Sequence, residues 1–443
     1  MRIGVRLGVN RAHGALAHEG RVLATAADVV AGRGGRQLSG LLKQLAASSP
    51  SIVDSVTWDV SALFERALRR TSGVQPVGAI RVLPRAPQHR GHPFELVRAL
   101  IAWEAVVTGG HDIFGAEMAA LDLDGALKQV ETAYAQGIRT LTITATGASG
   151  SAEHEQAIAG RVAEEFPDLR VCLSHEVGGL GLVEREATNV VNAALLDFCE
   201  DLVDRCERIT ATLDGPPSCW FATGDGGRVS ARRMRSVPAR GLAATAAAAL
   251  RGAALLSGRA DGPIVLTGPR ELLVGEVRAG LPRVEGDLLG ALGVRLVAPQ
   301  AVLSTRPAAT ADAVAAQLRE QEGAGAVGVL DEGGEELAER LHRKTRSVLD
   351  LVRTPADLCA VGAAVSEPSA WLDLVVTADT AEDLQRRQSM LERQALSLVA
   401  ASGARPGRER VIRSVATSLA FLGRDAYRLW VYVGSRPEPE QRA

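Results

Sequence analysis

The order of helix-like and strand-like segments between residues 125 and 173 constrains the fold most. Gly125–Gln136 has the periodicity of a helix, and the alternating, Thr-rich Arg139–Thr144 that of a strand. Ser151 is placed to cap a second helix, which ends before Pro167, and Arg170–Leu173 follows as another strand. This α-β-α-β order predicts a layered α/β domain.

Length and composition narrow the class of protein. The chain has 443 residues, of which 46% are hydrophobic, and a net charge of −2. These values exclude a disordered chain and give no electrostatic reason to expect a nucleic-acid or membrane partner. The start does not resemble a signal peptide and no long apolar run follows, so we expect a cytoplasmic protein. The spacing of the five cysteines predicts buried free thiols.

Further elements are expected along the rest of the chain. Strands are predicted at Arg2–Gly8 and Arg21–Thr25, paired around the turn at residues 18–20. The other expected segments are helices at Glu184–Leu213, Ala311–Glu322 and Glu335–Leu351, a connection at Thr305–Thr310, strands at Pro263–Thr267, Leu372–Val376 and Tyr427–Val433, a helix capped by Thr380, and a frayed tail at Arg436–Ala443.

One glycine-rich segment matches the dinucleotide-binding motif in its residues but not in the order of the elements around it. Gly323–Gly328 reads G-x-G-x-x-G, but a helix-like segment precedes it and the strand-like Ala326–Leu330 follows. A dinucleotide site needs the opposite order, because the pyrophosphate meets the N-terminus of the following helix. We therefore interpret the segment as a turn from helix to strand.

Three polar clusters are candidate sites. The first is His111 and Asp112 in a glycine-flanked loop, where a carboxylate can fix the tautomer of a histidine. The second is His175 and Glu176 at a strand end, followed by Glu184, Thr188 and Asn192 at a spacing that shares one helix face. The third is Asp225 in a glycine turn. An ordinary turn, the solvated side of a helix and a second tight turn are the respective alternatives.

The second cluster carries a family resemblance. His154-Glu155, Glu164–Pro167, Leu173–Val177, Glu184-Arg185 and Val191–Ala193 resemble, in order, the hydantoinase/oxoprolinase family. The match continues through Gly224–Gly227, Arg251–Gly258 and Leu419–Gly423, and the chain resembles the hydantoinase A-like branch of the actin-like ATPases.

The resemblance implies a fold, an activity and partners. It implies an actin-like α/β fold of two RNase-H-like domains with a nucleotide cleft between them, which we place at residues 1–176 and at 177–370, the latter shortened near 305. A C-terminal βα element would occupy 371–443. Active members of the family use ATP and Mg²⁺ to open a cyclic amide, often together with a second subunit.

Both expected phosphate loops depart from the family pattern Asp-x-Gly-Gly-Thr. The first reads Arg6-Leu7-Gly8-Val9-Asn10, so a cation replaces the carboxylate and Val9 replaces a glycine. The second reads Thr267-Gly268-Pro269-Arg270, in which Thr267 takes the place of the acid and Pro269 lacks an N–H donor. The glycine run near the end of the cleft is reduced to Val361–Ala364. Family-type ATP chemistry is therefore expected to fail.

Two functions remain open at this point. The leading hypothesis is a protein that does not hydrolyse ATP, with no cofactor and no metal site. It would act as a structural or regulatory partner of a second hydantoinase-type subunit or intact paralogue, or bind a small metabolite in the old cleft. The alternative is an enzyme for a cyclic amide or related molecule, with or without ATP, using His111, Asp112, His175, Glu176 and Asp225. The loop positions Arg6, Gly8, Asn10, Gly268 and Arg270 are the candidate cofactor contacts, and the two arginines are alternative anion ligands.

Overall fold

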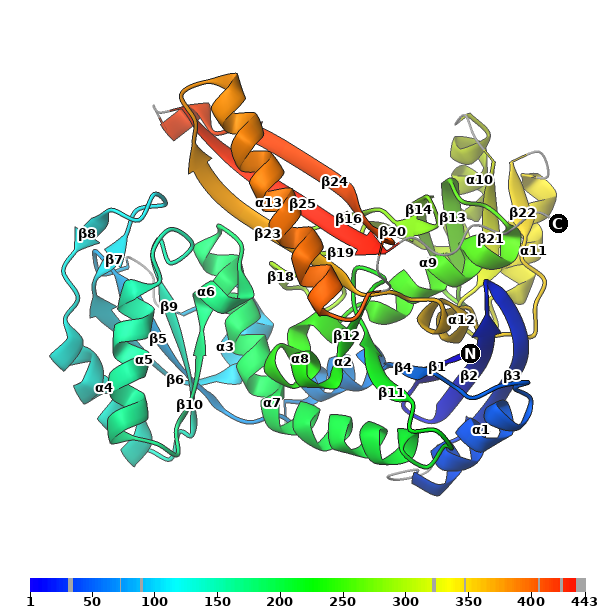
Figure 1. Ribbon diagram of the computed structural model, residues 1–443, viewed down its shortest axis with the longest axis horizontal. Helices are drawn as coiled ribbons and strands as arrows, with labels where there is room; N and C mark the ends of the chain where they lie inside the picture. Colours follow the sequence, from blue (N-terminus) through cyan, green and yellow to red (C-terminus); the bar gives the residue numbers. More distant parts are fainter. Residues whose placement is uncertain are drawn as a thin grey trace.

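The computed structural model shows a mixed α/β protein with three sheets in its body and a projecting C-terminal unit (Figure 1). It describes residues 1–30, 35–71, 73–87, 91–320, 324–345, 348–404, 407–422 and 425–435. The expected frayed tail at 436–443 lies outside these residues. No helix in the described ranges is both long and apolar enough to span a membrane.

The first sheet has six strands in the order β12-β11-β4-β1-β2-β3. The strands are β1 (Arg2–Leu7), β2 (Arg11–His18), β3 (Arg21–Val29), β4 (Ser55–Asp59), β11 (Ser218–Ala222) and β12 (Arg228–Ser230). The helices that pack with it are α1 (Gly35–Ala47), α2 (Ser61–Arg70), α7 (Leu182–Thr210), α8 (Ala231–Ser236) and the short η1 (Pro238–Gly241). β1 pairs with β2 and not directly with β3, so the expected pairing was wrong. The intervening β2 is built largely from Ala, Gly and His, which give a weak strand signal.

The second sheet, β10-β9-β5-β6, is entirely parallel. Its strands are β5 (Val77–Leu83), β6 (Ile101–Thr108), β9 (Thr140–Ala145) and β10 (Arg170–Leu173). The remaining elements here are α3 (Glu95–Leu100), α4 (Leu123–Ala135), α5 (Glu153–Glu165), α6 (Ser174–Val177) and the small pair β7 (Gly110–His111) and β8 (Glu117–Ala119). The expected α-β-α-β order is confirmed here by α4, β9, α5 and β10.

The third sheet has β15-β14-β13-β21-β22 in order, with β20 also paired to β14. Its strands are β13 (Gly262–Thr267), β14 (Glu271–Arg278), β15 (Leu281–Pro282), β20 (Leu303–Pro307), β21 (Gly325–Val329) and β22 (Leu349–Leu351). Its helices are α9 (Ala244–Ser257), α10 (Ala311–Glu320), α11 (Glu335–Lys344) and η2 (Ala308–Thr310). Helix α12 (Leu358–Ala364) packs between α9 and strands β1 and β2 of the first sheet. Four short strands form two side pairs: β16 (Val284–Glu285) with β19 (Gln300–Ala301), and β17 (Leu288–Leu289) with β18 (Arg295–Leu296).

Three expectations for this region are settled by the structure. The expected connection at 305–310 is instead strand β20 followed by η2, and the expected helix 335–351 ends at Lys344 because residues 349–351 form a strand. β21 follows α10, which confirms the helix-to-strand order of the glycine-rich segment over its described residues. Gly323 lies outside them.

The C-terminal unit is a three-stranded antiparallel sheet, β23-β25-β24, covered on one face by a helix (Figure 1). It comprises β23 (Ser369–Thr377), α13 (Ala381–Ala401), β24 (Glu409–Ser418), η3 (Ala420–Leu422) and β25 (Ala426–Ser435). Thr380 caps α13 as expected, with its side chain accepting a hydrogen bond from the amide of Asp383. Strand β24 was not anticipated.

The first and third sheets share one topology, and this positions the site. In each, an antiparallel hairpin is followed by parallel strands, giving β3-β2-β1-β4-β11 and β20-β14-β13-β21-β22. This is the arrangement expected of an RNase-H-like unit. The first sheet runs across the expected boundary at residue 176, because β11 and β12 come from beyond it, and the all-parallel sheet is inserted between β4 and α7.

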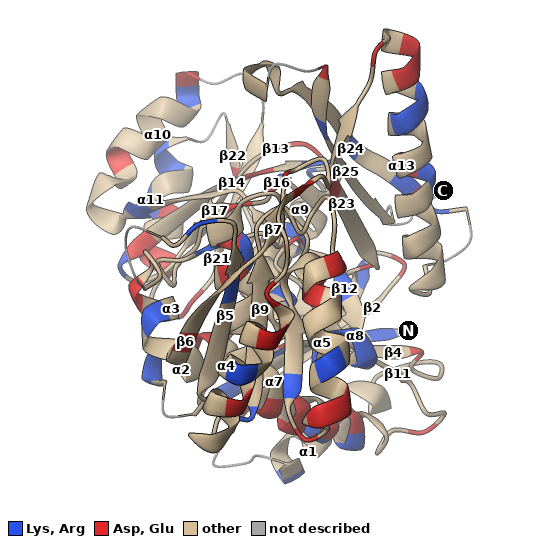
Figure 2. Cartoon of the chain, turned by 90° about the vertical axis from the view of Figure 1, so that its left-hand side faces the viewer, with Lys and Arg blue, Asp and Glu red and all other residues tan. Residues whose placement is uncertain are grey.

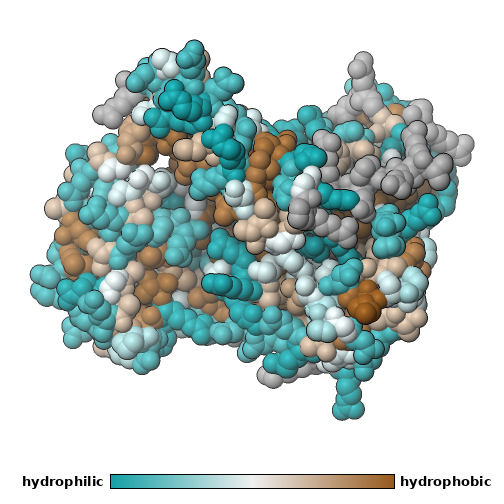
Figure 3. Space-filling model, in the orientation of Figure 1, coloured by the Kyte–Doolittle hydropathy of each residue, from teal (hydrophilic) through white to brown (hydrophobic). Residues whose placement is uncertain are grey.

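Charged residues of both signs occur on the same helices. Figure 2 shows Lys/Arg and Asp/Glu positions interleaved along α10 and α13. In Figure 3, polar and apolar residues are interspersed over the face in view. Among the described residues, the five cysteines are free, and Cys199, Cys206 and Cys359 are buried as expected.

Candidate functional site

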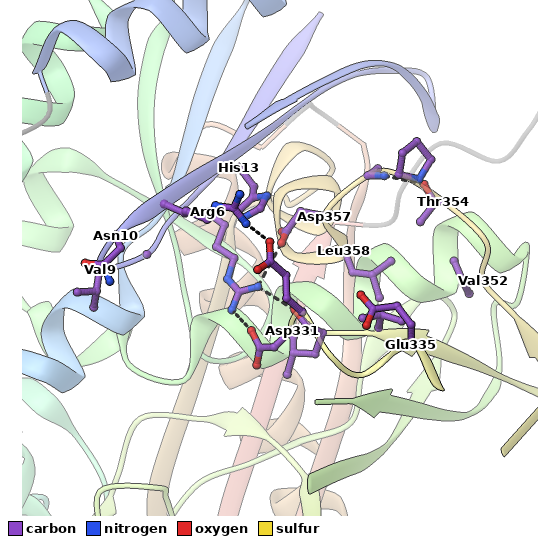
Figure 4. Close-up of a pocket in the computed structure, with 17 residues that line it drawn as sticks. Arg6, Val9, Asn10, His13, Asp331, Glu335, Val352, Thr354, Asp357 and Leu358 are labelled. Atoms are coloured by element: carbon purple, nitrogen blue, oxygen red, sulfur yellow. Dashed lines mark hydrogen bonds and ion pairs between the residues drawn. The ribbon is translucent and has the colours of Figure 1, made fainter. Parts of the chain in front are cut away.

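The two lobes built on the first and third sheets meet at a cavity of about 580 Å³ (Figure 4). The turn from β1 to β2 forms one wall and carries Arg6, Arg11 and His13. The opposite wall comes from residues 329–332 after β21, from Glu335 of α11 and from residues 352–358 before α12. Both walls are therefore loops at the ends of strands.

Arg6 crosses this cleft. Its Nη2 lies 2.6 Å from Asp331 Oδ1 and its Nη1 lies 3.2 Å from Asp357 Oδ2. Nη1 also donates to the carbonyl oxygen of Leu330 at 2.9 Å. The Arg6 side chain is 18% exposed and that of Asp357 9% exposed, so the second ion pair is largely shielded from water. The guanidinium is thus held between the segment after β21 on the opposite lobe and the N-cap residue of α12, a helix that packs against β1.

A second ion pair crosses the cleft nearer to solvent. Arg11 pairs with Glu332, and both side chains are exposed. His13 lies on the same wall, where burial lowers its pKa and keeps the ring neutral at pH 7. The cavity lining thus carries four carboxylates against two guanidiniums.

The expected loop residues divide between the two hairpins. Gly8 and Asn10 line the cavity together with Arg6, whereas Gly268 and Arg270 are not among its described lining residues. Gly268 nevertheless lies close by, because a Cβ built on it would be 3.9 Å from Asp331 Oδ2. Arg270 is exposed. The structure therefore does not bring the two arginines together into one anion site.

The two hairpins can be matched residue by residue through the hydrogen bond that closes each turn. Gly8 N donates to Arg11 O, and Gly268 N donates to Glu271 O, each at 2.9 Å. By this equivalence Leu266, which is fully buried, occupies the position in the second hairpin that Arg6 occupies in the first. The position of the missing acid in the second loop therefore falls on Leu266 and not on Thr267, one residue earlier than the sequence suggested.

Three acidic residues beside the cleft escaped the sequence analysis. Asp331 follows β21, and Asp357 directly precedes α12. Only Asp331 had a local signal in the sequence for a site residue, namely its position just after a predicted strand. Asp59 ends β4 and is the register partner of Arg6. It accepts hydrogen bonds from Ser61 N at 3.1 Å and Thr245 Oγ1 at 2.7 Å. Burial raises the pKa of Asp59 to about 6.

His111 and Asp112 lie away from this cleft, in the loop beside α5. His111 is buried, its ring centroid is 4.2 Å from that of His154, and its Nε2 is 3.9 Å from Glu153. Asp112 Oδ1 accepts the amides of Phe114 and Ala116 at 2.8 and 2.9 Å. Asp112 therefore shapes its own turn, which is the structural alternative stated above.

His175 forms a carboxylate–histidine pair with Glu155. Its Nδ1 lies 2.7 Å from Glu155 Oε2, and its backbone amide donates to the same oxygen at 3.0 Å. The hydrogen bond with Glu155 raises the pKa of His175. Ser174 Oγ donates to the other carboxylate oxygen at 2.5 Å. Glu176 is exposed and takes no part in these contacts.

Two of the three residues of the polar stripe on α7 are buried and Glu184 is half-buried, so its interpretation as a solvated face was wrong. Thr188 is 1% exposed and its Oγ1 accepts the amide of Val297 at 3.0 Å. Asn192 is 3% exposed and its Nδ2 donates to the carbonyl oxygen of Ser236 at 3.1 Å. These side chains dock neighbouring loops onto the helix.

Asp225 joins the first lobe to the C-terminal unit. Its Oδ2 accepts from Ser369 Oγ at 2.6 Å, and its backbone oxygen accepts from the hydroxyl of the buried Tyr432 at 3.3 Å. Its Oδ1 accepts the amide of Gly227 at 3.1 Å. The five candidate catalytic residues are thus not brought together: His111 and Asp112, His175 and Glu176, and Asp225 lie in three separate places. Within the described residues, no group of three or more His, Cys, Asp or Glu side chains is placed to hold a metal ion.

Comparison with known proteins identifies the architecture. No protein-family model matches the chain, and no curated protein matches its sequence. Among solved structures, an ATP-dependent caprolactamase from Pseudomonas jessenii is similar, with a TM-score of 0.73 and 14% identity over 99% of this chain and 88% of that one. A nucleotide-free acetone carboxylase is also similar, with a TM-score of 0.69 and 10% identity over the same shares. The chain therefore has the actin-like α/β fold that its sequence led us to expect.

Proposed function

We propose that this chain is a hydantoinase/oxoprolinase-type protein of the cytoplasm that does not hydrolyse ATP. It acts as a structural or regulatory subunit beside a second hydantoinase-type subunit or an intact paralogue. Two findings support the family: the ordered motif resemblance, and a fold shared with two proteins whose names describe ATP-dependent reactions.

The contact of Arg6 with Asp331 and Asp357 carries the proposal. Phosphoryl transfer depends on positioned phosphates and on a metal ion that neutralises their charge, and Mg²⁺ binds through carboxylate oxygens. At the end of β1 this chain presents a guanidinium, and its distances of 2.6 and 3.2 Å already commit it to two carboxylates.

The remaining lining does not fit a nucleotide with its metal. A triphosphate entering the cavity would face four carboxylates and only two guanidiniums, each already paired. Val9 adds a side chain where the phosphate loop of the family approaches with bare backbone. The residues of this cavity therefore do not favour a reaction that uses ATP.

Calorimetric titration with ATP and Mg²⁺, run beside an ATPase assay, tests the proposal. We expect no saturable binding at about millimolar nucleotide and no turnover. Micromolar, metal-dependent binding with turnover would overturn the proposal. Light scattering after co-expression with a hydantoinase-type second subunit tests the partner role, for which a stable complex is expected.

A second candidate function rests on the His175–Glu155 pair. A carboxylate that fixes the tautomer of a partly exposed histidine is the arrangement of a general acid or base. This pair favours an enzyme that opens a cyclic amide or related molecule. His175→Ala should then abolish turnover of a hydantoin or lactam, while the control Glu131→Ala, at an exposed position on α4, should not. Equal rates in both variants would exclude this site.

A further inference from the structure

We propose that the cavity between the lobes binds a small zwitterion, an amino acid whose carboxylate and ammonium groups are separated by a short chain. The inference rests on the proposed function only in that ATP does not compete for this space. It adds the chemical class of the ligand.

The cavity presents opposite charges on its two walls. Arg6 and Arg11 stand on the β1–β2 side, and Asp331, Glu332 and Glu335 stand on the other lobe. Figure 4 shows Arg6 facing Asp331 across the cavity. The volume of about 580 Å³ lies within the range of small-molecule sites. A ligand carrying both charges matches both walls at once, whereas a polyanion or a simple carboxylate meets repulsion from the acidic wall.

The ion pairs of Arg6 and of Arg11 at this cavity differ in their exposure to water. The Arg6–Asp357 pair is shielded, with side chains 18% and 9% exposed. The Arg11–Glu332 pair is 51% and 76% exposed, and such exposed pairs contribute little to stability. A zwitterion can therefore replace the outer pair while the inner pair stays intact. Its carboxylate would bind Arg11 and its ammonium group Glu332.

Neighbouring groups extend each half of this site. Arg6 contacts Oδ1 of Asp331, and the amide of Gly333 contacts Oε2 of Glu335, so within the described residues Asp331 Oδ2 and Glu335 Oε1 remain as acceptors for an ammonium group. The amide side chain of Asn10 lies on the wall of Arg11 as a donor for a carboxylate. The ligand thus meets more than one partner at each end.

Calorimetric titration at low ionic strength tests the inference. The probes are ω-amino acids from glycine to aminohexanoate, each compared with the amine and the carboxylic acid of equal length. We expect at least one zwitterion to bind about tenfold or more tightly than both of its singly charged analogues, and binding to weaken with added salt.

Variants locate the site. Arg11→Gln and Glu332→Gln should each weaken zwitterion binding about tenfold or more. Arg161→Gln is the matched control, because it removes another exposed ion pair, with Glu165 on α5. It should bind like the parent chain. Unchanged melting temperatures show that the three variants remain folded, since all remove only exposed pairs.

The outcomes separate this inference from the proposed function. Equal or tighter binding of the simple amines, absence of saturable binding by every zwitterion, or insensitivity to both cleft variants would each overturn it. ATP is titrated independently. A failure of the zwitterions without ATP binding removes only the ligand class, whereas metal-dependent ATP binding removes the proposed function.

Discussion

The hairpins β1–β2 and β13–β14 occupy equivalent places in the two lobes but behave differently. Both close with the same 2.9 Å hydrogen bond, from Gly8 and from Gly268. In the first hairpin Arg6 binds Asp331 on the other lobe and Asp357 at the start of α12. In the second, Thr267 donates to the carbonyl oxygen of Gly334 within the same lobe.

The two hairpins therefore contribute differently to the contacts between the lobes. The ion pairs of Arg6 and Arg11 all originate in the first hairpin, while the equivalent Leu266 is packed into the core of the second lobe. The first hairpin is thus committed to holding the lobes together and the second to the folding of its own lobe. Substitutions in the two hairpins should therefore have different consequences.

The largest effect is expected for Arg6→Ala. Removing the guanidinium leaves the shielded carboxylate of Asp357 without its cation, and breaking a pair of this kind should lower the free energy of unfolding by about 2 to 4 kcal/mol. Urea denaturation of the variant measures the loss.

The double variant Arg6→Ala/Asp357→Asn is its control. If an unpaired buried charge causes the loss, neutralising Asp357 should restore part of the stability. A single variant as stable as the parent chain would contradict the bridging role of Arg6.

A smaller effect of opposite sign is expected for Asp59→Asn, next to Arg6 in the sheet. Burial raises the pKa of Asp59 to about 6 from 3.8, so the folded state holds this proton more tightly than the unfolded state. Stability from Asp59 is present at low pH and is lost as the pH rises from about 4 through 6. The variant should be more stable than the parent by about 2 kcal/mol at pH 8 and about equal at pH 4.

Melting temperatures of both proteins between pH 4 and pH 8 test this sign. The asparagine oxygen still accepts the amide of Ser61, and its NH2 group can donate to the hydroxyl of Thr245 in place of accepting from it, so the main change is the loss of the charge. A variant that is less stable at pH 8 would show that the ionised carboxylate is stabilised in the fold by its neighbours, Arg6 among them.

The sequence predicted most of the layered architecture because the elements with strong periodicity are local. Helix α13 with its Thr380 cap and the order α4, β9, α5, β10 needed only neighbouring residues. Strand β20 escaped because Pro307 ends it and alanines follow, a pattern typical of a connection. Strand β22 escaped because three residues after a helix carry no periodicity of their own.

The site was less predictable because its contacts join distant parts of the chain. Arg6 was identified through the family resemblance, but its partners Asp331 and Asp357 lie 325 and 351 residues away in sequence. Nothing near Asp357 marks it as the partner of a cation, since its Oδ1 also caps α12. Only the folded arrangement of the lobes shows that the cleft is bridged by ion pairs.

The smallest effect is expected in the second hairpin, for Thr267→Val. Thr267 is fully buried and its Oγ1 donates to Gly334 O at 2.9 Å, so the valine removes one hydrogen bond while keeping the shape. The loss should be about 1 kcal/mol in urea denaturation, and it should add to that of Arg6→Ala because the two side chains share no partner. A loss larger than that of Arg6→Ala, or strong coupling between the two, would mean that both hairpins hold the lobes together and that they are not asymmetric.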